Sequence, residues 1–243
     1  MIRRITGAIF HSLNEWKRRR SLERKFSHMS TQEIYSKIYK ENIWGQDHTG
    51  FFSGGGSSSP NVSKYIDFVD SFIRTNNITR VVDLGCGDFR VMRTITDRNK
   101  TLNYIGVDIV PDLISFVQNH YGNERIQFLC LDAIKDNLPD ADLVTVRQVL
   151  QHLSNHDVTS ILKKLVKYKY ALVSEHILTG PGVIPNKDKK TGQFTRLDLN
   201  SSLLINLSPF SLDATQVFEY DENYGDKSAV IRTYLLQNNS VVF

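Results

Sequence analysis

The fold is decided by the stretch Val81-Val82-Asp83-Leu84-Gly85-Cys86-Gly87-Asp88-Phe89. Apolar residues run into an acid and then into Gly-x-Gly, and a helical pattern follows. This order predicts a buried parallel strand whose C-terminal end turns sharply into a helix. Glycines are needed at such a turn because they let the backbone bend tightly and approach a ligand closely. Ligands of open α/β sheets bind at these carboxyl ends, so the stretch also predicts a binding site.

Strand and helix patterns alternate from residue 78 onward. We expect strands near 79–84, 103–108, 126–131, 141–147 and 170–175, with helices near 89–97, 111–121 and 155–167 between them. Alternation at this spacing is typical of βαβ units with helices on both faces of the sheet. Residues 214–220 and 229–237 alternate with period two and are expected to form a closing antiparallel pair. The predicted fold is therefore α/β, with a Rossmann-like, mostly parallel, seven-stranded sheet and an antiparallel closing strand.

The chain divides into three expected parts, which are a basic amphipathic N-terminal helix (1–25), a helix with a Gly/Ser-rich lid or linker (26–60) and the main domain (61–243). The Gly/Ser run indicates either a flexible connector or a mobile flap over a ligand.

Two local signals mark helix starts on either side of this run. Ser30 and Glu33 form a predicted capping box that opens a helix through about Glu41. Pro60 is expected to be the first residue of the following helix, with Ser59 as its cap.

Composition is that of an ordinary globular protein, with 40% hydrophobic and 23% charged residues. Charge is unevenly placed: residues 1–25 hold eight Lys or Arg and two Glu, whereas the whole chain carries a net charge of +4. The apolar face of residues 1–20 can lie on an anionic membrane surface or pack on protein. The sequence contains no apolar run long enough to span a membrane.

Cysteine usage indicates the compartment. Cys86 and Cys130 are the only cysteines, and without metal-ligand spacing they are expected to be reduced core residues of a cytoplasmic protein. We predict no metal site, and the sequence does not indicate an oligomeric state.

Three successive predicted strands end in an acid, namely Asp83, Asp108 and Asp132. Together these carboxylates would line one crevice. Asp108 lies 25 residues after Asp83, where a carboxylate accepts hydrogen bonds from both hydroxyls of a ribose. A dehydrogenase could use the same design, but the third glycine of its Gly-x-Gly-x-x-Gly motif would fall at Arg90.

These motifs resemble those of the class I S-adenosylmethionine (SAM)-dependent methyltransferases. Asp83-Leu84-Gly85-Cys86-Gly87 is similar to their first motif, Asp108 to the ribose-binding acid and Asp132-Ala133 to the adenine-contacting pair. The resemblance implies SAM as cofactor, bound by Asp83, Gly85, Cys86, Gly87, Asp108, Ile109, Asp132, Ala133 and Arg147. One departure is Phe89, which replaces a glycine frequent in the family and is expected to narrow the room near the cofactor tail.

A narrower resemblance involves Trp44-Gly45, the Gly/Ser run, Ser174-Glu175-His176 and a segment from Asn186 to Arg196. This combination is similar to bacterial methyltransferase-like proteins associated with surface polysaccharide or glycan pathways. The resemblance implies an O-methyltransferase that acts on a sugar hydroxyl of a glycan or polysaccharide precursor.

A sugar hydroxyl is a weak nucleophile and needs a base to take its proton. His152 and His176 follow the fourth and fifth predicted strands, so either can be this base, oriented by Glu175 or Asp188. A polar loop contains Asp188 and Arg196, where Arg196 can bind an acidic acceptor such as a sugar phosphate.

Two other classes of function remain as alternatives. A nucleic-acid methyltransferase is compatible with the basic N-terminus, but residues 26–243 are slightly acidic and lack a patch of interleaved aromatic and basic residues. A non-catalytic scaffold in a glycan-assembly complex would share the fold but would not need the series of acids.

Overall fold

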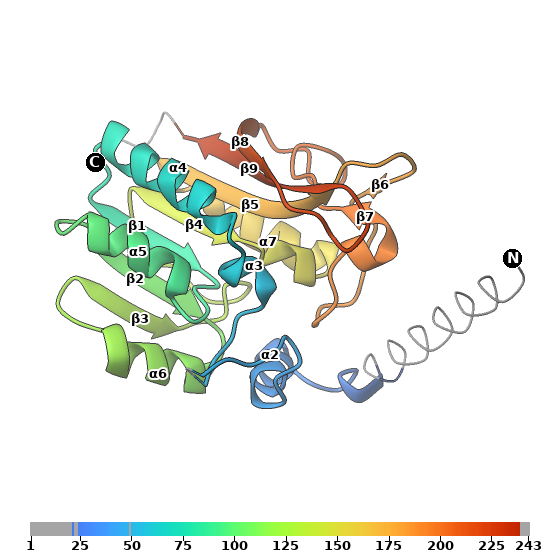
Figure 1. Cartoon of the computed structure of the whole chain (residues 1–243), viewed down its shortest axis with the longest axis horizontal. Coiled ribbons are helices and arrows are strands. Elements are labelled where there is room, and N and C mark those ends of the chain that lie inside the picture. Colours follow the sequence, from blue (N-terminus) through green and yellow to red (C-terminus); the bar gives the residue numbers. More distant parts are fainter. Residues whose placement is uncertain (1–20, 22–23, 49, 239–243) are drawn as a thin grey trace, which may run out of the picture.

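The computed structural model describes residues 21, 24–48 and 50–238 (Figure 1). The predicted amphipathic helix of residues 1–20 lies outside this part. A seven-stranded sheet forms the centre, in the order β3-β2-β1-β4-β5-β9-β8. Its strands are β1 (Arg80–Leu84), β2 (Asn103–Asp108), β3 (Ile126–Cys130), β4 (Leu143–Arg147), β5 (Tyr170–Leu178), β8 (Thr215–Asp221) and β9 (Ala229–Gln237).

The first five strands are parallel, and β9 is antiparallel to both β5 and β8. This arrangement confirms the predicted Rossmann-like fold and its closing antiparallel pair. A separate two-stranded sheet pairs β6 (Ile184–Pro185) with β7 (Ser201–Ser202).

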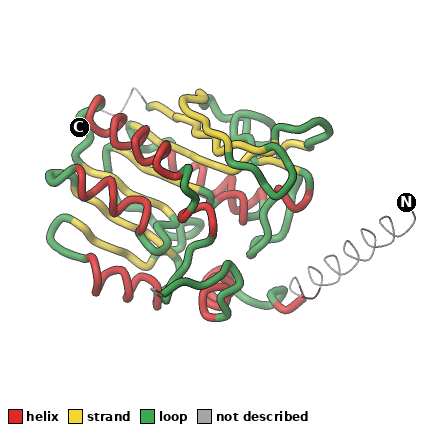
Figure 2. Tube along the Cα trace, viewed as in Figure 1, coloured by secondary structure: helices red, strands yellow, loops and turns green. Residues whose placement is uncertain are grey.

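Helices cover both faces of the sheet, as Figures 1 and 2 show. The helices α5 (Arg90–Arg98) and α6 (Pro111–Tyr121) connect β1 to β2 and β2 to β3, whereas α7 (Asn155–Leu165) connects β4 to β5 on the other side of β1. The chain therefore moves across the sheet in one direction from β1 to β3 and in the opposite direction from β4 to β5. Because crossovers between parallel strands are right-handed, α7 lies on the face of the sheet opposite to α5 and α6. The helix α4 (Val62–Thr75) packs beside α5.

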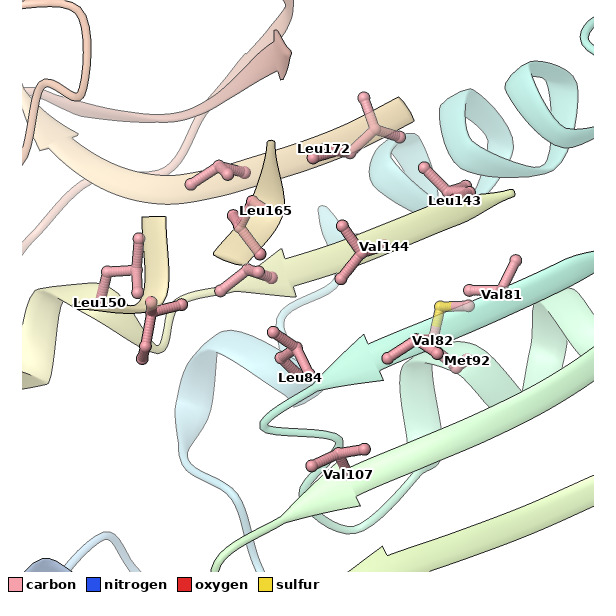
Figure 3. Packing of buried hydrophobic residues seen from close by; sticks show 14 of the residues in the cluster. Val81, Val82, Leu84, Met92, Val107, Leu143, Val144, Leu150, Leu165 and Leu172 are labelled. Atoms are coloured by element: carbon pink, nitrogen blue, oxygen red, sulfur yellow. The ribbon is translucent and has the colours of Figure 1, made fainter. Parts of the chain in front are cut away.

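The core lies between the sheet and these helices. Figure 3 shows Val81, Val82 and Leu84 of β1 near Val107 of β2 and Met92 of α5, and all five are at most 3% exposed. The central strands β1 and β4 are buried on both faces because helices cover both. The burial of these side chains holds the carboxyl ends of the strands in fixed positions, and this edge carries the site described below.

The segment before α4 belongs to the same core. The capping box is confirmed: Ser30 accepts a hydrogen bond from the Glu33 N–H, and the Glu33 carboxylate accepts one from the Ser30 N–H at 2.7 Å. It opens α2 (Thr31–Lys40), whose buried residues Ile34 and Ile38 join the main hydrophobic cluster. From α2 the chain crosses the carboxyl ends of the strands through the short helix α3 (Gly55–Ser58) before it reaches α4 (Figure 1).

Two local predictions need correction. The helix after the Gly/Ser run begins at Val62 with Asn61 at its N-cap, so Pro60 lies before it. The Ser59 hydroxyl instead accepts a hydrogen bond from the Asn61 N–H at 3.2 Å and donates one to Glu222 at 2.8 Å. Cys130, expected in the core, is exposed because it lies at the end of the edge strand β3.

Within the described part of the chain, no helix combines the length and hydropathy that crossing a bilayer requires.

Candidate active site

A cavity of about 500 Å³ lies at the carboxyl ends of the parallel strands. This volume is in the range of small-molecule and cofactor sites. Its wall includes residues of β1, β2, β4 and β5, the turns after β1 to β4, and the segment between α2 and α4. All nine residues predicted to bind the cofactor line it, namely Asp83, Gly85, Cys86, Gly87, Asp108, Ile109, Asp132, Ala133 and Arg147.

The two glycines after β1 are required by both backbone conformation and space. Gly85 and Gly87 have φ angles of +72° and +54°, which side-chain-bearing residues rarely adopt. A Cβ atom at Gly85 would also collide with the side chain of Val149, and one at Gly87 would collide with that of Ser53. The turn is therefore packed against two other walls of the cavity, and its backbone faces the space directly.

The acids at the strand ends have different surroundings. Asp83 is buried and accepts hydrogen bonds from the Tyr104 hydroxyl at 3.0 Å and the Thr145 hydroxyl at 2.7 Å. Asp108 accepts hydrogen bonds from the backbone N–H groups of Gly87 and Val110, both at 3.2 Å, and from no side chain among the described residues. Burial raises the pKa of each carboxyl to about 6. Asp108 is the more accessible of the two to a ligand, because it is partly exposed whereas Asp83 is buried.

The segment before α3 is fastened to the glycine turn by reciprocal hydrogen bonds. The Ser53 N–H donates to the Asp88 carboxylate at 3.1 Å, and the Asp88 N–H donates to the Ser53 hydroxyl at 2.8 Å. Arg90 extends the contact by bridging Asp88 and Asp47. The Gly/Ser run that follows forms a wall of the cavity from Gly54 to Ser57.

Phe89 does not narrow the cavity, contrary to expectation. Its backbone takes the left-handed conformation (φ 64°) that the usual glycine would adopt. Its side chain is 1% exposed and packs among the rings of Tyr104, Tyr121 and Phe128. The aromatic ring therefore lies in the core, where it fills space on the side of the turn away from the cavity.

Arg147 lies at the end of β4 and connects several walls. Its guanidinium donates to the Gly56 carbonyl at 2.9 Å and to the Tyr220 hydroxyl at 3.2 Å. It also lies over the ring of Tyr65, 5.0 Å from the ring centroid. These contacts fix the Gly/Ser wall against β4 and β8.

His152 and His176 both line the cavity but differ in their partners. The His152 ring lies 5.2 Å from the ring of Trp44, and its buried Nδ1 has no hydrogen-bond partner in the described structure. Burial, assisted by the charge of Lys189, lowers the pKa of His152 to about 3. The Nε2 of His176 donates to the Glu222 carbonyl at 2.6 Å, and burial lowers its pKa as well. Both imidazoles are therefore neutral at physiological pH.

The residues expected to orient a histidine have other partners. Glu175 is fully buried, and its oxygens accept hydrogen bonds from the N–H groups of Leu150 and Gln151 at 2.9 and 3.1 Å. Burial raises its pKa to about 8. Asp188 is exposed and accepts from the Asn155 N–H at 2.7 Å. Neither side chain lines the cavity or bonds to a histidine among the described residues, so this part of the prediction is wrong.

The structure also corrects the role that we expected for Arg196. It is 0% exposed and donates to the Leu150 carbonyl at 2.9 Å and to the Asn155 side chain at 2.6 Å. It therefore cannot contact an acidic acceptor in the cavity. Together with Glu175 it fixes the turn from Leu150 to His152, since the two side chains bond to its carbonyl and N–H groups.

Sequence reasoning missed part of the cavity wall. Trp44 comes from the segment after α2, and Gln193 from the loop before β7; the Trp44 Nε1–H donates to the Gln193 carbonyl at 3.4 Å across 149 residues of sequence. Gln148 and Gln151 complete this side. The resemblance had included Trp44 and the segments that contain Gln148, Gln151 and Gln193, but it gave none of these side chains a role in the site. No group of three or more His, Cys, Asp or Glu residues is arranged to hold a metal ion in the described structure.

The central region of the chain matches a known protein family. Residues 81–168 match the family described as "Methyltransferase domain", and this range contains the glycine turn, all three acids and His152. No curated protein matches the chain by sequence.

Several solved structures share the fold. One is the magnesium protoporphyrin IX methyltransferase of Synechocystis PCC 6803 with bound SAM, with 13% identity, a TM-score of 0.52, and coverage of 85% of this chain and 97% of that chain. Another is the N-terminal domain of EvdMO1 in the presence of SAH and D-fucose, with 14% identity, a TM-score of 0.51, and coverage of 88% and 99%. A third is TehB from Haemophilus influenzae, with 16% identity, a TM-score of 0.50, and coverage of 71% and 62%.

The fold, the cavity and the family match agree. Residues 81–168 match a methyltransferase domain, and the described chain has the Rossmann-like fold of the solved magnesium protoporphyrin IX methyltransferase.

Proposed function

We propose that the protein is a SAM-dependent methyltransferase that acts on oxygen and methylates a sugar hydroxyl of a glycan or polysaccharide precursor. The observation that carries the proposal is His152, a neutral imidazole on the cavity wall whose buried Nδ1 has no hydrogen-bond partner in the described structure. A hydroxyl acceptor must lose its proton during methyl transfer, and a hydrogen-bond acceptor at the cavity wall can take it.

The residues present fit SAM. Asp108 has free hydrogen-bonding capacity for ribose hydroxyls, and the glycine turn exposes backbone to the cavity. SAM supplies an activated methyl group that carries its own leaving group. The protein therefore has to align the acceptor, exclude water and remove one proton. The Nδ1 of His152 accepts that proton, and its low pKa suffices because a hydroxyl becomes strongly acidic as its oxygen gains a methyl group.

Mass spectrometry with CD3-labelled SAM tests the reaction class. We expect a CD3 group on oxygen when the protein is incubated with candidate saccharides. Parallel samples contain amines and RNA, since transfer to nitrogen or to a nucleic acid would contradict the proposal. The EvdMO1 domain of the same fold was crystallised in the presence of D-fucose, so deoxyhexosides belong in the panel. Heat-inactivated protein is the control.

We also propose that residues 1–20 bind the protein to the inner face of a membrane. The support is their sequence pattern of basic residues beside an apolar helical face. Deletion of residues 1–20 is expected to abolish sedimentation with phosphatidylglycerol vesicles and to spare turnover on a soluble acceptor. Phosphatidylcholine vesicles and high salt are the controls. If the full chain does not sediment with anionic vesicles, there is no membrane contact of this kind.

A further inference from the structure

One side of the cavity contains an unusual set of buried polar atoms without hydrogen-bond partners in the described structure. Four belong to neighbouring side chains, namely Gln148 Nε2, Gln151 Oε1, His152 Nδ1 and Gln193 Nε2. A buried polar atom without a partner destabilises a protein unless a ligand or water satisfies it. All four residues line the cavity, so a bound acceptor is in a position to satisfy them.

The residues that carry these atoms form one continuous group. The Gln151 Nε2 lies 3.5 Å from Gln148 Oε1 and 3.5 Å from His152 Nε2. Trp44 covers the His152 ring and, through its Nε1–H, holds the Gln193 backbone. The group therefore combines a polar surface with the face of an aromatic ring.

The unpaired atoms include both donors and acceptors. The amide nitrogens of Gln148 and Gln193 donate, whereas Gln151 Oε1 and the free His152 nitrogen can accept. A hydroxyl both donates and accepts, so several hydroxyls can satisfy all four atoms. A phosphate or carboxylate only accepts, and an ammonium only donates, so either would leave part of the group unpaired.

The charges around the cavity also disfavour an anionic acceptor. Arg147 is the only Lys or Arg in the described lining; its Nη2 bonds to Gly56 and Tyr220, and its Nε is buried without a hydrogen-bond partner in the described structure. Five acids line the same cavity, namely Asp83, Asp88, Asp108, Asp132 and Glu222. A phosphate placed there would lose its hydration beside five acids and would gain only this one guanidinium.

From this arrangement we infer that Gln148, Gln151 and Gln193, with His152 and Trp44, form the acceptor site, and that the site selects an uncharged, polyhydroxylated sugar unit. The inference rests on the proposed function and specifies its substrate class. The amides bind the hydroxyls beside the one that reacts, and Trp44 supplies an apolar surface for the C–H face of the sugar ring. Any phosphate or amine of a larger precursor then lies outside the cavity.

The first test compares matched acceptors that differ only in charge. Methyl glycosides of common hexoses and deoxyhexoses are incubated with CD3-labelled SAM, alongside the corresponding sugar 1-phosphates and amino sugars. We expect label on the neutral glycosides, with kcat/KM at least about ten-fold higher than for the charged counterparts. If no neutral glycoside is labelled, the inference is overturned. Label only on a hydroxyl of sugar phosphates would overturn the inference but leave O-methylation of sugars intact, whereas label on nitrogen or on RNA would end both.

The second test changes the amides. Gln151→Leu and Gln193→Leu keep roughly the side-chain volume but remove the hydrogen bonds, so each is expected to raise the KM for the acceptor by about ten-fold. The affinity for S-adenosylhomocysteine should not change. If the amides were merely structural, their loss would weaken the binding of both ligands. Gln216→Leu is the matched control, because Gln216 is exposed on β8 and outside the cavity. Wild-type acceptor KM in both cavity variants would overturn the assignment.

Discussion

His152→Ala is expected to lower kcat at saturating SAM and acceptor by about 100-fold or more, the contribution typical of a positioned general base. The Nδ1 of His152 is buried at the cavity wall and free of hydrogen bonds among the described residues. Alanine would leave the proton of the acceptor hydroxyl without a recipient. The binding of S-adenosylhomocysteine should remain within about two-fold, because His152 lies on the acceptor side and away from Asp108.

Controls separate proton removal from packing. His152→Gln retains a hydrogen-bonding group beside Trp44 but cannot take up the proton, so it should be nearly as slow as alanine. His156→Ala removes an exposed histidine of α7 and should keep full activity. His176→Ala is expected to have the smaller effect, since the Nε2 of His176 is already bonded to the Glu222 carbonyl. Full activity of both the His152 and the His176 variants would mean that neither is the base.

The pH profile provides an independent check on this role. Because burial lowers the pKa of His152 to about 3, the imidazole is unprotonated from pH 8 down to pH 5 and remains able to accept a proton. We therefore expect kcat at saturating ligands to show no decline assigned to His152 in this range. The contrary result would be a fall in kcat at low pH, with a midpoint near 6.5, that disappears in His152→Gln. It would show that the imidazole is not buried in the way described.

The sequence alone predicted much of the proposed cofactor-binding wall, because each residue pattern involved is local in the chain. Asp83, Asp108 and Asp132 each lie at or just after the carboxyl end of a strand, and parallel strands place these ends at one edge of the sheet. The spacing of these acids therefore predicts the three-dimensional arrangement. Gly85 and Gly87 are similarly local, since both the turn and the close approach of other walls require glycine at those positions.

The acceptor side was less predictable for two physical reasons. Trp44 and Gln193 meet from distant segments, and no sequence spacing encodes their contact. Glu175 and His176 are neighbours on β5, so their side chains point to opposite faces of the strand, and only His176 lines the cavity. This alternation of side-chain direction along a strand could have shown that Glu175 and His176 do not face the same cavity. By contrast, nothing in the polar loop around Arg196 indicates that its guanidinium is fully buried against Leu150.

Asp108→Ala is expected to weaken S-adenosylhomocysteine binding by about 30-fold or more, which corresponds to about 2 kcal/mol. The Asp108 carboxylate lies at the end of β2 on the cavity wall, and in the described part of the chain its hydrogen-bond donors are backbone N–H groups. Its remaining acceptor capacity is therefore available for the two ribose hydroxyls. Alanine would leave those hydroxyls unpaired in a site shielded from water, and isothermal titration calorimetry measures the loss directly. Asp112→Ala, which alters an exposed acid in the first turn of α6, should bind normally.

The same interaction predicts a pH dependence of binding. Burial raises the pKa of Asp108 to about 6, so the carboxylate is ionised above this pH and protonated below it. Ribose hydroxyls donate more strongly to the ionised form, and the dissociation constant should rise as pH falls from 8 to 5, by up to about ten-fold per pH unit below 6. Asp108→Asn should flatten much of this dependence. Asp83 also titrates near 6, but the Tyr104 and Thr145 hydroxyls occupy its oxygens, so its protonation should alter affinity less. Wild-type affinity in Asp108→Ala, or equal pH dependence in Asp108→Asn and the wild type, would show that the ribose is not held by this carboxylate.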